Sequence, residues 1–510
     1  QALRSRGPAV GRGWGAMAEA AEQARRAPWQ AWGFLALAVV LNLAIGSASS
    51  YSYWKIGFYK HFTPCGTGRA LKDDVDVATI LAEEEGERCW DHRSLSSLYS
   101  WCIFGGFICI TPGILFDKFG PRVTAAYGLL LVNVGIGGML ALLSMGGTPS
   151  IALVGFFYLL EEQGGAASLY MVAVCVLVRA FPSDLVGLAS GAVAIAFGLS
   201  GLLWTALAGE LFGFVDGADP NDTNITGFLA LVLLATDVSG IAIFCTAPRV
   251  LALVEGGDDG PEGTQPLASD EADKSSAPPI SRSICSWDCL CLMALYSVAS
   301  SQVIGMSSYL SSIPTAFDTL DTGVFSAIPF AANVGGRVVY AILVDCLARC
   351  GGRPAITLGN LWINALYVLC FGLLAASAHS GHAHGWVVYA AVGLAYSSYG
   401  GSVCFASSFT KLSFSAGHVG ILIGLLFTVA AVASTLFSAF FFVDNSLGSR
   451  GLERVPSDFA GTWSAACASA LCAFPVTLVV VVKAQCGARS DNYVAGRELG
   501  YEEVLHDPAF

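Results

Sequence analysis

The sequence carries unusually little charge. Only 13% of its 510 residues are Asp, Glu, Lys or Arg, whereas soluble domains carry about 25%. It has no basic stripe of the kind that binds nucleic acid, and its 16 Cys residues are too sparse for a disulfide scaffold. Its apolar content also excludes a disordered, collagen-like or coiled-coil chain.

Catalytic signatures are missing as well. The sequence has no nucleophile and base pair, phosphate-binding loop or metal-ligand set at a useful spacing. His379, His382 and His384 are ligand-like residues, but no Cys or carboxylate completes the group, and we interpret it as a solvated loop. We therefore expect no enzyme activity, no cofactor and no bound metal.

Hydrophobic runs fill the chain instead, with 55% hydrophobic residues and a mean hydropathy of +0.63. A helix that crosses the hydrocarbon core needs about 20 mostly apolar residues. Runs of that length predict an all-α polytopic membrane protein with twelve transmembrane helices, at 31–57, 94–116, 123–145, 150–180, 184–213, 226–247, 286–312, 323–345, 354–376, 384–408, 418–442 and 460–483.

The basic residues set the orientation, because short cytoplasmic loops retain Lys and Arg. With both termini in the cytoplasm, the inner segments hold 17 of the 26 Lys and Arg residues and the outer parts hold 8. We therefore expect both termini in the cytoplasm. Plasma membrane is the default location and an organelle membrane the alternative.

The outer loops hold features that leave alternatives open. Asn221 and Asn224 begin two sequons, which are either glycosylated or polar turns. Cys65 and Cys89 are the only Cys residues in loop 58–93, where they form a disulfide or remain two thiols.

A polar stretch rich in Gly, Ser, Asp and Pro divides the spans six and six. Its composition is typical of a disordered linker. We expect a cytoplasmic segment at 1–30, a six-helix half at 31–247, a linker at 248–285, a second half at 286–483 and a tail at 484–510. Residues 1–16, which precede Met17, are left out of this reasoning as a tag or an upstream read-through.

The loop between spans two and three reads DKFGPR, from Asp117 to Arg122. It resembles the Asp, Gly, Arg motif that the major facilitator superfamily carries in this loop. The resemblance implies two six-helix halves that rock around a central substrate, with Asp117, Gly120 and Arg122 as a gate motif. The second half has an echo in Asp345 and Arg353. The alternative is a short charged turn.

The fifth span resembles a smaller group within that superfamily. An aromatic and basic turn leads into a stretch rich in Gly and Ala at 187–201, and small residues of this kind let helices approach closely. The pattern is similar to monocarboxylate transporters, oxalate:formate antiporters and nodulin-like transporters. Asp184 departs from the basic residue that many of them carry.

Arg337 lies about fourteen residues into span eight, where an unpaired charge costs about 2.5–3.5 kcal/mol. Monocarboxylate transporters are similar in placing an Arg on this span that binds the substrate carboxylate. A guanidinium suits that role because it can bind a carboxylate bidentately. We predict that Arg337 contacts substrate, with Asn333 beside it. The alternative is a fixed ion pair with Glu161, Glu162 or Asp237.

Lys55 follows Tyr51 and an aromatic pair near the outer end of span one. The resemblance to monocarboxylate transporters implies that Lys55 and Tyr51 face the outward cavity and contact substrate. The alternative is a lysine that reaches the interface from an aromatic belt.

Three acids inside spans are candidates for carrying a proton. Glu161 and Glu162 interrupt span four, and Asp237 lies in span six. Two adjacent carboxylates do not share one helix face, so we expect at most one to face the substrate path. A further possibility is that span four begins near Gly164, with both acids at a helix start.

These features predict a transporter that moves a small organic anion, above all a monocarboxylate, with or without a proton. A neutral amino-acid facilitator is the alternative, because DKFGPR after a long outer loop also resembles the large-neutral-amino-acid facilitators. A non-transporting receptor is the alternative from another class. The expected partners are the lipid bilayer and an anionic small molecule, and we expect a monomer.

Overall fold

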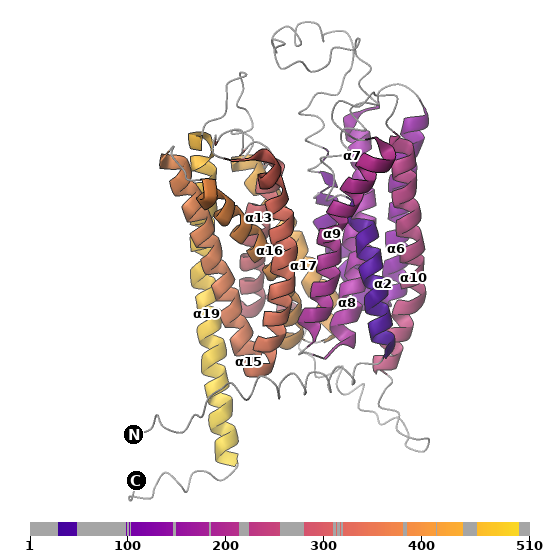
Figure 1. Cartoon of the computed structure of the whole chain (residues 1–510). Helices are drawn as coiled ribbons and strands as arrows, with labels where there is room; N and C mark the ends of the chain where they lie inside the picture. Colours follow the sequence, from indigo (N-terminus) through magenta and orange to yellow (C-terminus); the bar gives the residue numbers. More distant parts are fainter. Residues whose placement is uncertain are drawn as a thin grey trace, which may run out of the picture.

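The computed structural model describes residues 29–47, 98, 101–102, 104–145, 149–182, 185–213, 224–255, 280–309, 313, 317, 320–380, 385–414, 416–441 and 456–498. Their regular secondary structure is entirely helical (Figure 1). Lys55, Tyr51, Cys65, Cys89, Asn221 and most of the expected linker lie outside the described residues.

The N-terminal half contains the expected spans one to six. Its helices are α2 (Trp29–Ile45), α6 (Ile110–Ser144), α7 (Ile151–Glu162), the π-helix η3 (Gln163–Leu169), α8 (Tyr170–Ala180), α9 (Val186–Phe212) and α10 (Ile225–Glu255). The helix α6 holds spans two and three, which meet at Gly120 with φ +81°. Only glycine adopts such a φ at little cost, so this residue makes the turn.

The C-terminal half contains spans seven to twelve. Its elements are α12 (Ile280–Ile284), α13 (Trp287–Tyr309), α15 (Thr322–Ser380), α16 (Gly385–Ser413), the short helix η6 (Ala416–His418), α17 (Val419–Phe441), η7 (Pro456–Phe459) and α19 (Ala460–Glu498). Spans eight and nine are the two arms of α15, Ala327–Gly351 and Arg353–Ser380.

Nine helical segments of the described chain are long and apolar enough to cross a membrane. One of them, Phe104–Ser144, includes two of the predicted spans. The shorter α2 and the more polar α16 supply the others. The twelve-helix fold that the sequence predicted is therefore confirmed.

Span four is one continuous helical segment over Ile151–Ala180, in agreement with its predicted range of 150–180. The further possibility that it begins near Gly164 is therefore wrong, and both glutamates lie in its interior. Two other boundaries differ from expectation. The helix α10 runs past residue 247 to Glu255, because Val250 and Leu251 are buried and extend its apolar face. The helix α19 continues past residue 483 to Glu498.

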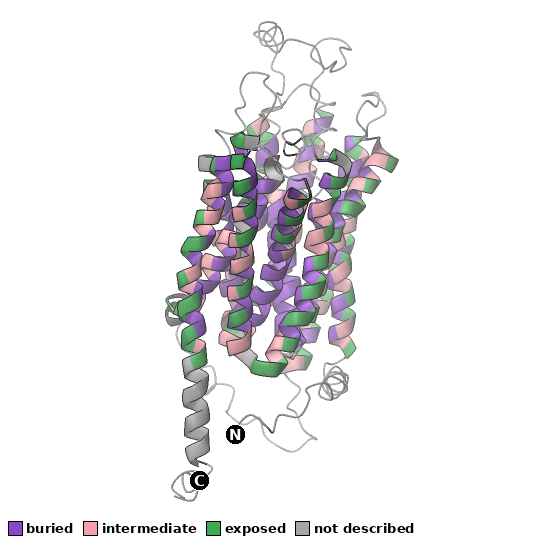
Figure 2. Ribbon diagram, turned by 60° about the vertical axis from the view of Figure 1, so that its left-hand side comes forward, coloured by how far each residue is buried: buried purple, intermediate pink, exposed green. Residues whose placement is uncertain are grey.

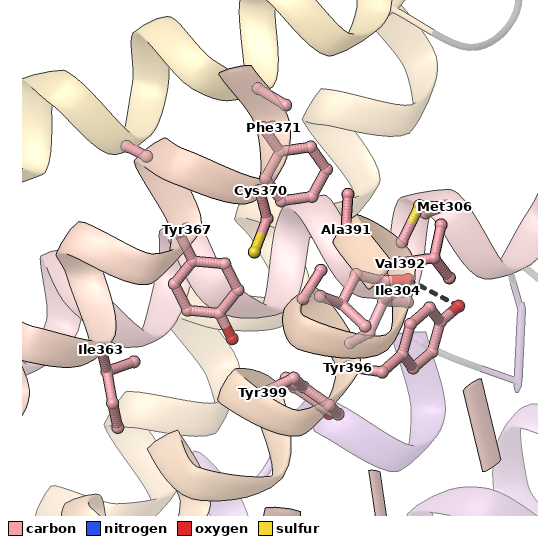
Figure 3. Close-up of a cluster of buried hydrophobic side chains, with 14 of the residues drawn as sticks. Ile304, Met306, Ile363, Tyr367, Cys370, Phe371, Ala391, Val392, Tyr396 and Tyr399 are labelled. Atoms are coloured by element: carbon pink, nitrogen blue, oxygen red, sulfur yellow. Dashed lines mark hydrogen bonds between the residues drawn. The ribbon is translucent and has the colours of Figure 1, made fainter. Parts of the chain in front are cut away.

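Each half has its own apolar core. The C-terminal core includes the stacked rings of Tyr367 and Phe371 (Figure 3). A second cluster lies within the N-terminal half, and a third joins that half to Val419 and Ile423 of α17. Buried residues gather on the inner helix faces, whereas exposed ones lie on the outside of the bundle (Figure 2).

Glycine lets span four pack closely on span three. A Cβ on Gly135 would lie 2.5 Å from the backbone nitrogen of Glu161. One on Gly128 would lie 2.9 Å from the carbonyl oxygen of Gly164, inside the π-helix. Backbone lies against backbone at both places, and there is no flexible side chain to yield.

Replacing Gly135 by Ala should therefore destabilise the protein. The methyl group would force α6 and α7 apart, and overpacking of this kind costs about 1–3 kcal/mol. The measurement is the thermal unfolding midpoint of the purified protein in detergent. Gly209→Ala on α9 is the matched control, because a Cβ there meets no atom within 4 Å. Equal midpoints for the two variants would contradict the packing argument.

Candidate functional site

The two halves are joined at the end of the bundle where α2 begins and α10 ends (Figure 1). Asp117, near the close of span two, accepts hydrogen bonds from the backbone nitrogens of Gly420 (3.1 Å) and Ile421 (2.7 Å). These nitrogens belong to the first turn of α17, where unpaired N–H groups and the helix dipole favour an anion. Arg179 adds an ion pair to Asp117 at 2.7 Å.

Asp345 makes the equivalent contact from the C-terminal half to the N-terminal half. Its carboxylate accepts hydrogen bonds from the backbone nitrogens of Gly187 (2.8 Å) and Leu188 (2.7 Å), in the first turn of α9. A Cβ on Gly187 would lie 2.5 Å from Oδ1 of Asp345, so glycine permits the approach. Span two thus holds span eleven, and span eight holds span five, as internal repeats would.

A third contact closes the same end. Lys411, in the last turn of α16, donates hydrogen bonds to the carbonyl oxygens of Val178 (2.7 Å) and Phe181. These carbonyls lie at the end of α8, where a cation is favoured by the helix dipole. We name Asp117, Arg179, Asp345 and Lys411 the gate cluster.

The other residues of the predicted gate motif lie apart from these contacts. Gly120 forms the turn, and Arg122 is exposed. Arg353 forms an ion pair with Asp288 of α13 and does not reach Asp345. The basic partner of Asp117 is therefore Arg179, which the motif does not contain.

Arg337 lies on α15 where this half meets α9. The residue is 5% exposed, and its Nη1 donates a hydrogen bond to the carbonyl oxygen of Ala194. A Cβ on Gly198 would lie 3.1 Å from Nη1, so the α9 backbone lies directly against the guanidinium. The Nε atom is buried and has no hydrogen-bond partner. Part of the guanidinium is thus left without an acceptor.

Tyrosine side chains from both halves lie near this charge. Tyr170 of α8, Tyr296 of α13 and Tyr399 of α16 are all within electrostatic range of Arg337. Phe427 of α17 links the halves, because its ring centroid lies 5.9 Å from that of Tyr170 and 5.2 Å from that of Tyr296. The side chains of Tyr296 and Tyr399 also interact with each other. A buried cation with aromatic side chains near it suits an anionic ligand with an apolar part.

Asn333 lies one turn before Arg337 on the same face of α15, and its buried Oδ1 atom has no hydrogen-bond partner. The structure therefore brings these two predicted residues together. Lys55 and Tyr51, the other predicted substrate contacts, fall outside the described residues.

Glu161 and Glu162 are buried inside the N-terminal half, with exposures of 4% and 2%. Both side chains are enclosed, and their carboxyl groups interact with each other. Glu162 also interacts with Tyr158 and Cys102. Oε2 of Glu161 and Oε1 of Glu162 have no hydrogen-bond partner.

No carboxylate within the described ranges forms an ion pair with Arg337. The described salt bridges join Arg179 to Asp117 and Arg353 to Asp288. Asp237 instead accepts a hydrogen bond from Nδ2 of Asn133 at 2.8 Å, on the outside of the N-terminal half. The fixed ion pair considered as an alternative for Arg337 does not form in this conformation.

Sequence reasoning missed Arg179, Lys411 and the three tyrosines near Arg337. The two basic residues had a signal in the sequence, since each lies in the last turn of its helix, where cations are common. The tyrosines had none, because a tyrosine inside a span is an ordinary core residue in sequence.

No protein-family model matches the chain, and no curated protein matches its sequence. Solved structures are similar in shape. The proton:xylose symporter XylE, bound to 6-bromo-6-deoxy-D-glucose, aligns with a TM-score of 0.60 at 12% identity, covering 86% of this chain and 94% of the symporter.

Two further solved structures are also similar in shape to this chain. A bacterial homologue of the iron transporter ferroportin, in an outward-facing state with soaked iron, gives a TM-score of 0.57 at 14% identity, over 87% of this chain and 98% of the homologue. The human organic anion transporter TETRAN gives 0.54 at 12% identity, over 88% and 99%. The chain therefore has the twelve-helix major facilitator fold.

Proposed function

We propose that the chain is a secondary transporter or facilitator for a small organic anion, with a monocarboxylate as the leading substrate, and that it works by alternating access. The observation that carries the proposal is Arg337. It is a buried cation between the halves that has no carboxylate partner among the described residues and keeps an unpartnered Nε. A buried charge inside a span is a functional feature by default.

Alternating access is supported by the gate cluster. Its contacts close one end of the path, and each is a set of hydrogen bonds that can break as a unit when the halves rock. If both termini are cytoplasmic, the closed end is the cytoplasmic one. The fold also accommodates this cargo class, since one similar structure is named an organic anion transporter.

Proton coupling is proposed for the pair formed by Glu161 and Glu162. Neither forms an ion pair within the described part of the chain. Two neighbouring carboxyl groups enclosed in a helix bundle suit a site that holds a proton, because ionising both would leave two uncompensated charges in a medium of low dielectric. Asp237 is not gathered with them, and its role in coupling stays a prediction.

Arg337 tests the substrate class. In proteoliposomes, labelled monocarboxylates should be taken up in preference to neutral amino acids and sugars. Arg337→Gln should raise the apparent substrate constant by about tenfold to a hundredfold, the loss expected for one charge-assisted hydrogen bond. The apparent substrate constant of Arg337→Lys should lie between those of wild type and Arg337→Gln, because lysine keeps the charge but lacks the planar guanidinium.

The control for this experiment is Lys483→Gln, which removes a cation of α19 that lies over the ring of Trp287, the first residue of α13. It should transport like wild type. An unchanged substrate constant in correctly folded Arg337→Gln protein would refute the ligand role, and preferred uptake of a neutral amino acid would favour the facilitator alternative.

Glu162 tests the proton. Wild-type uptake should fall when the pH gradient is collapsed at fixed external pH and membrane potential, whereas Glu162→Gln should no longer respond because its amide cannot release a proton. Glu210→Gln, at an exposed position near the end of α9, is the matched control. If wild-type uptake did not change when the pH gradient was collapsed, proton coupling would be refuted and the protein would be a facilitator.

The gate cluster tests alternating access. Asp345→Asn should weaken two charge-assisted hydrogen bonds, each worth about 1.5–3 kcal/mol, and lower the population closed at this end by at least about tenfold. Distances between spin labels on the two halves at this end measure that population. Asp321→Asn is the control, since Asp321 caps its own helix through the Val324 nitrogen at 2.8 Å. Identical distance distributions in wild type and Asp345→Asn would count against the gate.

A further inference from the structure

A polar pair faces outward from the N-terminal half. Nδ2 of Asn133 on α6 donates a hydrogen bond to Oδ1 of Asp237 on α10 at 2.8 Å. Asn133 is exposed and Asp237 is half-buried. The two helices lie side by side at the outer edge of the bundle (Figure 1).

Both residues lie deep in their spans. Asp237 comes 12 residues after Ile225, where α10 begins, and Asn133 comes 12 residues after Pro121, where span three begins. At 1.5 Å per residue each lies about 18 Å from its helix end. The two helices run in opposite directions, so the pair lies near the middle of the hydrocarbon core, which is about 30 Å thick.

The surroundings of the pair are apolar and exposed. Large side chains with exposures of 44% to 62% flank it on both helices, namely Leu130, Val134, Leu234, Val238 and Ile241. Side chains of this kind in a span face lipid. A carboxylate among them is costly unless something other than lipid covers it.

The hydrogen bonds of Asn133 and Asp237 indicate which donor groups a molecule that packs against this face needs. The Asn133 amide group uses Nδ2 for Asp237 and also for the carbonyl oxygen of Leu129, at 2.9 Å. Oδ1 of Asn133 and Oδ2 of Asp237 are therefore left as acceptors, and no described residue donates to them. A neutral amide oxygen beside a carboxylate oxygen favours a donor that carries a positive charge, since a cation both donates hydrogen bonds and offsets the carboxylate charge.

A second copy of this chain does not supply that donor from its described residues. The cation in the middle of its spans, Arg337, is 5% exposed. A symmetric contact through the same face would also bring two Asp237 carboxylates towards each other. Acyl chains carry no donor at this depth.

We propose that the face formed by Asn133, Asp237 and their apolar neighbours binds the transmembrane helix of a partner protein, and that this helix carries a Lys or Arg near the middle of its span. Gly137, one turn from Asn133, gives the partner backbone room, because a Cβ there would meet no atom within 4 Å. Small residues and interhelical polar bonds are what hold helices together in membranes. The proposal is independent of the transported substrate.

The test uses the full chain in liposomes with labelled single-span peptides of Leu and Ala, which carry Lys, Leu or Glu at the central position. Energy transfer between protein and peptide reports binding. The Lys peptide should bind about five- to thirtyfold more tightly than the Leu peptide, the range expected for an interhelical polar bond. The Glu peptide should not exceed the Leu peptide.

Variants separate the charge from general adhesion. Asp237→Asn should remove the preference for Lys, Asp237→Lys should transfer it to the Glu peptide, and Val238→Ala is the matched lipid-facing control. Equal binding of the Lys and Leu peptides to wild-type protein would overturn the proposal without any variant. Energy transfer between labelled copies of the protein that is lost in Asp237→Asn would identify a second copy as the occupant and would equally overturn it.

Discussion

A carboxylate held by the first turn of a helix from the opposite half is the contact on which the arrangement of the two halves depends. Asp117 binds the start of α17, and Asp345 binds the start of α9. Each acid satisfies backbone N–H groups that no helix can satisfy internally. Because water can replace these bonds when the helix ends separate, the contact is strong when closed and not prohibitively costly to open. A hydrophobic seam would lack that property.

The sequence predicted the twelve-helix fold well, because spans are read from apolar runs and the hydrocarbon core fixes their length. The boundaries were less certain where a helix leaves the membrane. The helices α10 and α19 both continue beyond their apolar spans, to Glu255 and Glu498. Once a helix is nucleated by its membrane span, adding polar residues costs little, and hydropathy does not report where it stops.

The residues of the candidate site could be identified only in part from the sequence. Arg337 stood out because a charge in a span is rare, and Asn333 followed from helical spacing. Residues that act as partners were harder to identify. Asp117 pairs with Arg179, 62 positions away, although Arg122 stands beside it in the sequence. Sequence spacing indicates which groups can share a helix, but contacts between helices depend on tertiary packing that one sequence does not reveal.

The proposed substrate contact and the proposed gate meet on the contact between α15 and α9. Arg337 and Asp345 lie eight residues apart on α15, and both bind α9, at Ala194 and at its first turn. In the symmetric contact between α6 and α17, the hydrogen bond that the described residues form at the corresponding depth is a neutral one, from the Ile110 nitrogen to Oγ1 of Thr428 at 3.0 Å. An anion that drew the guanidinium from Ala194 would therefore loosen one of the two contacts and leave the other intact. Such an asymmetry gives a ligand differential affinity for the two conformations, which is what a transport cycle requires.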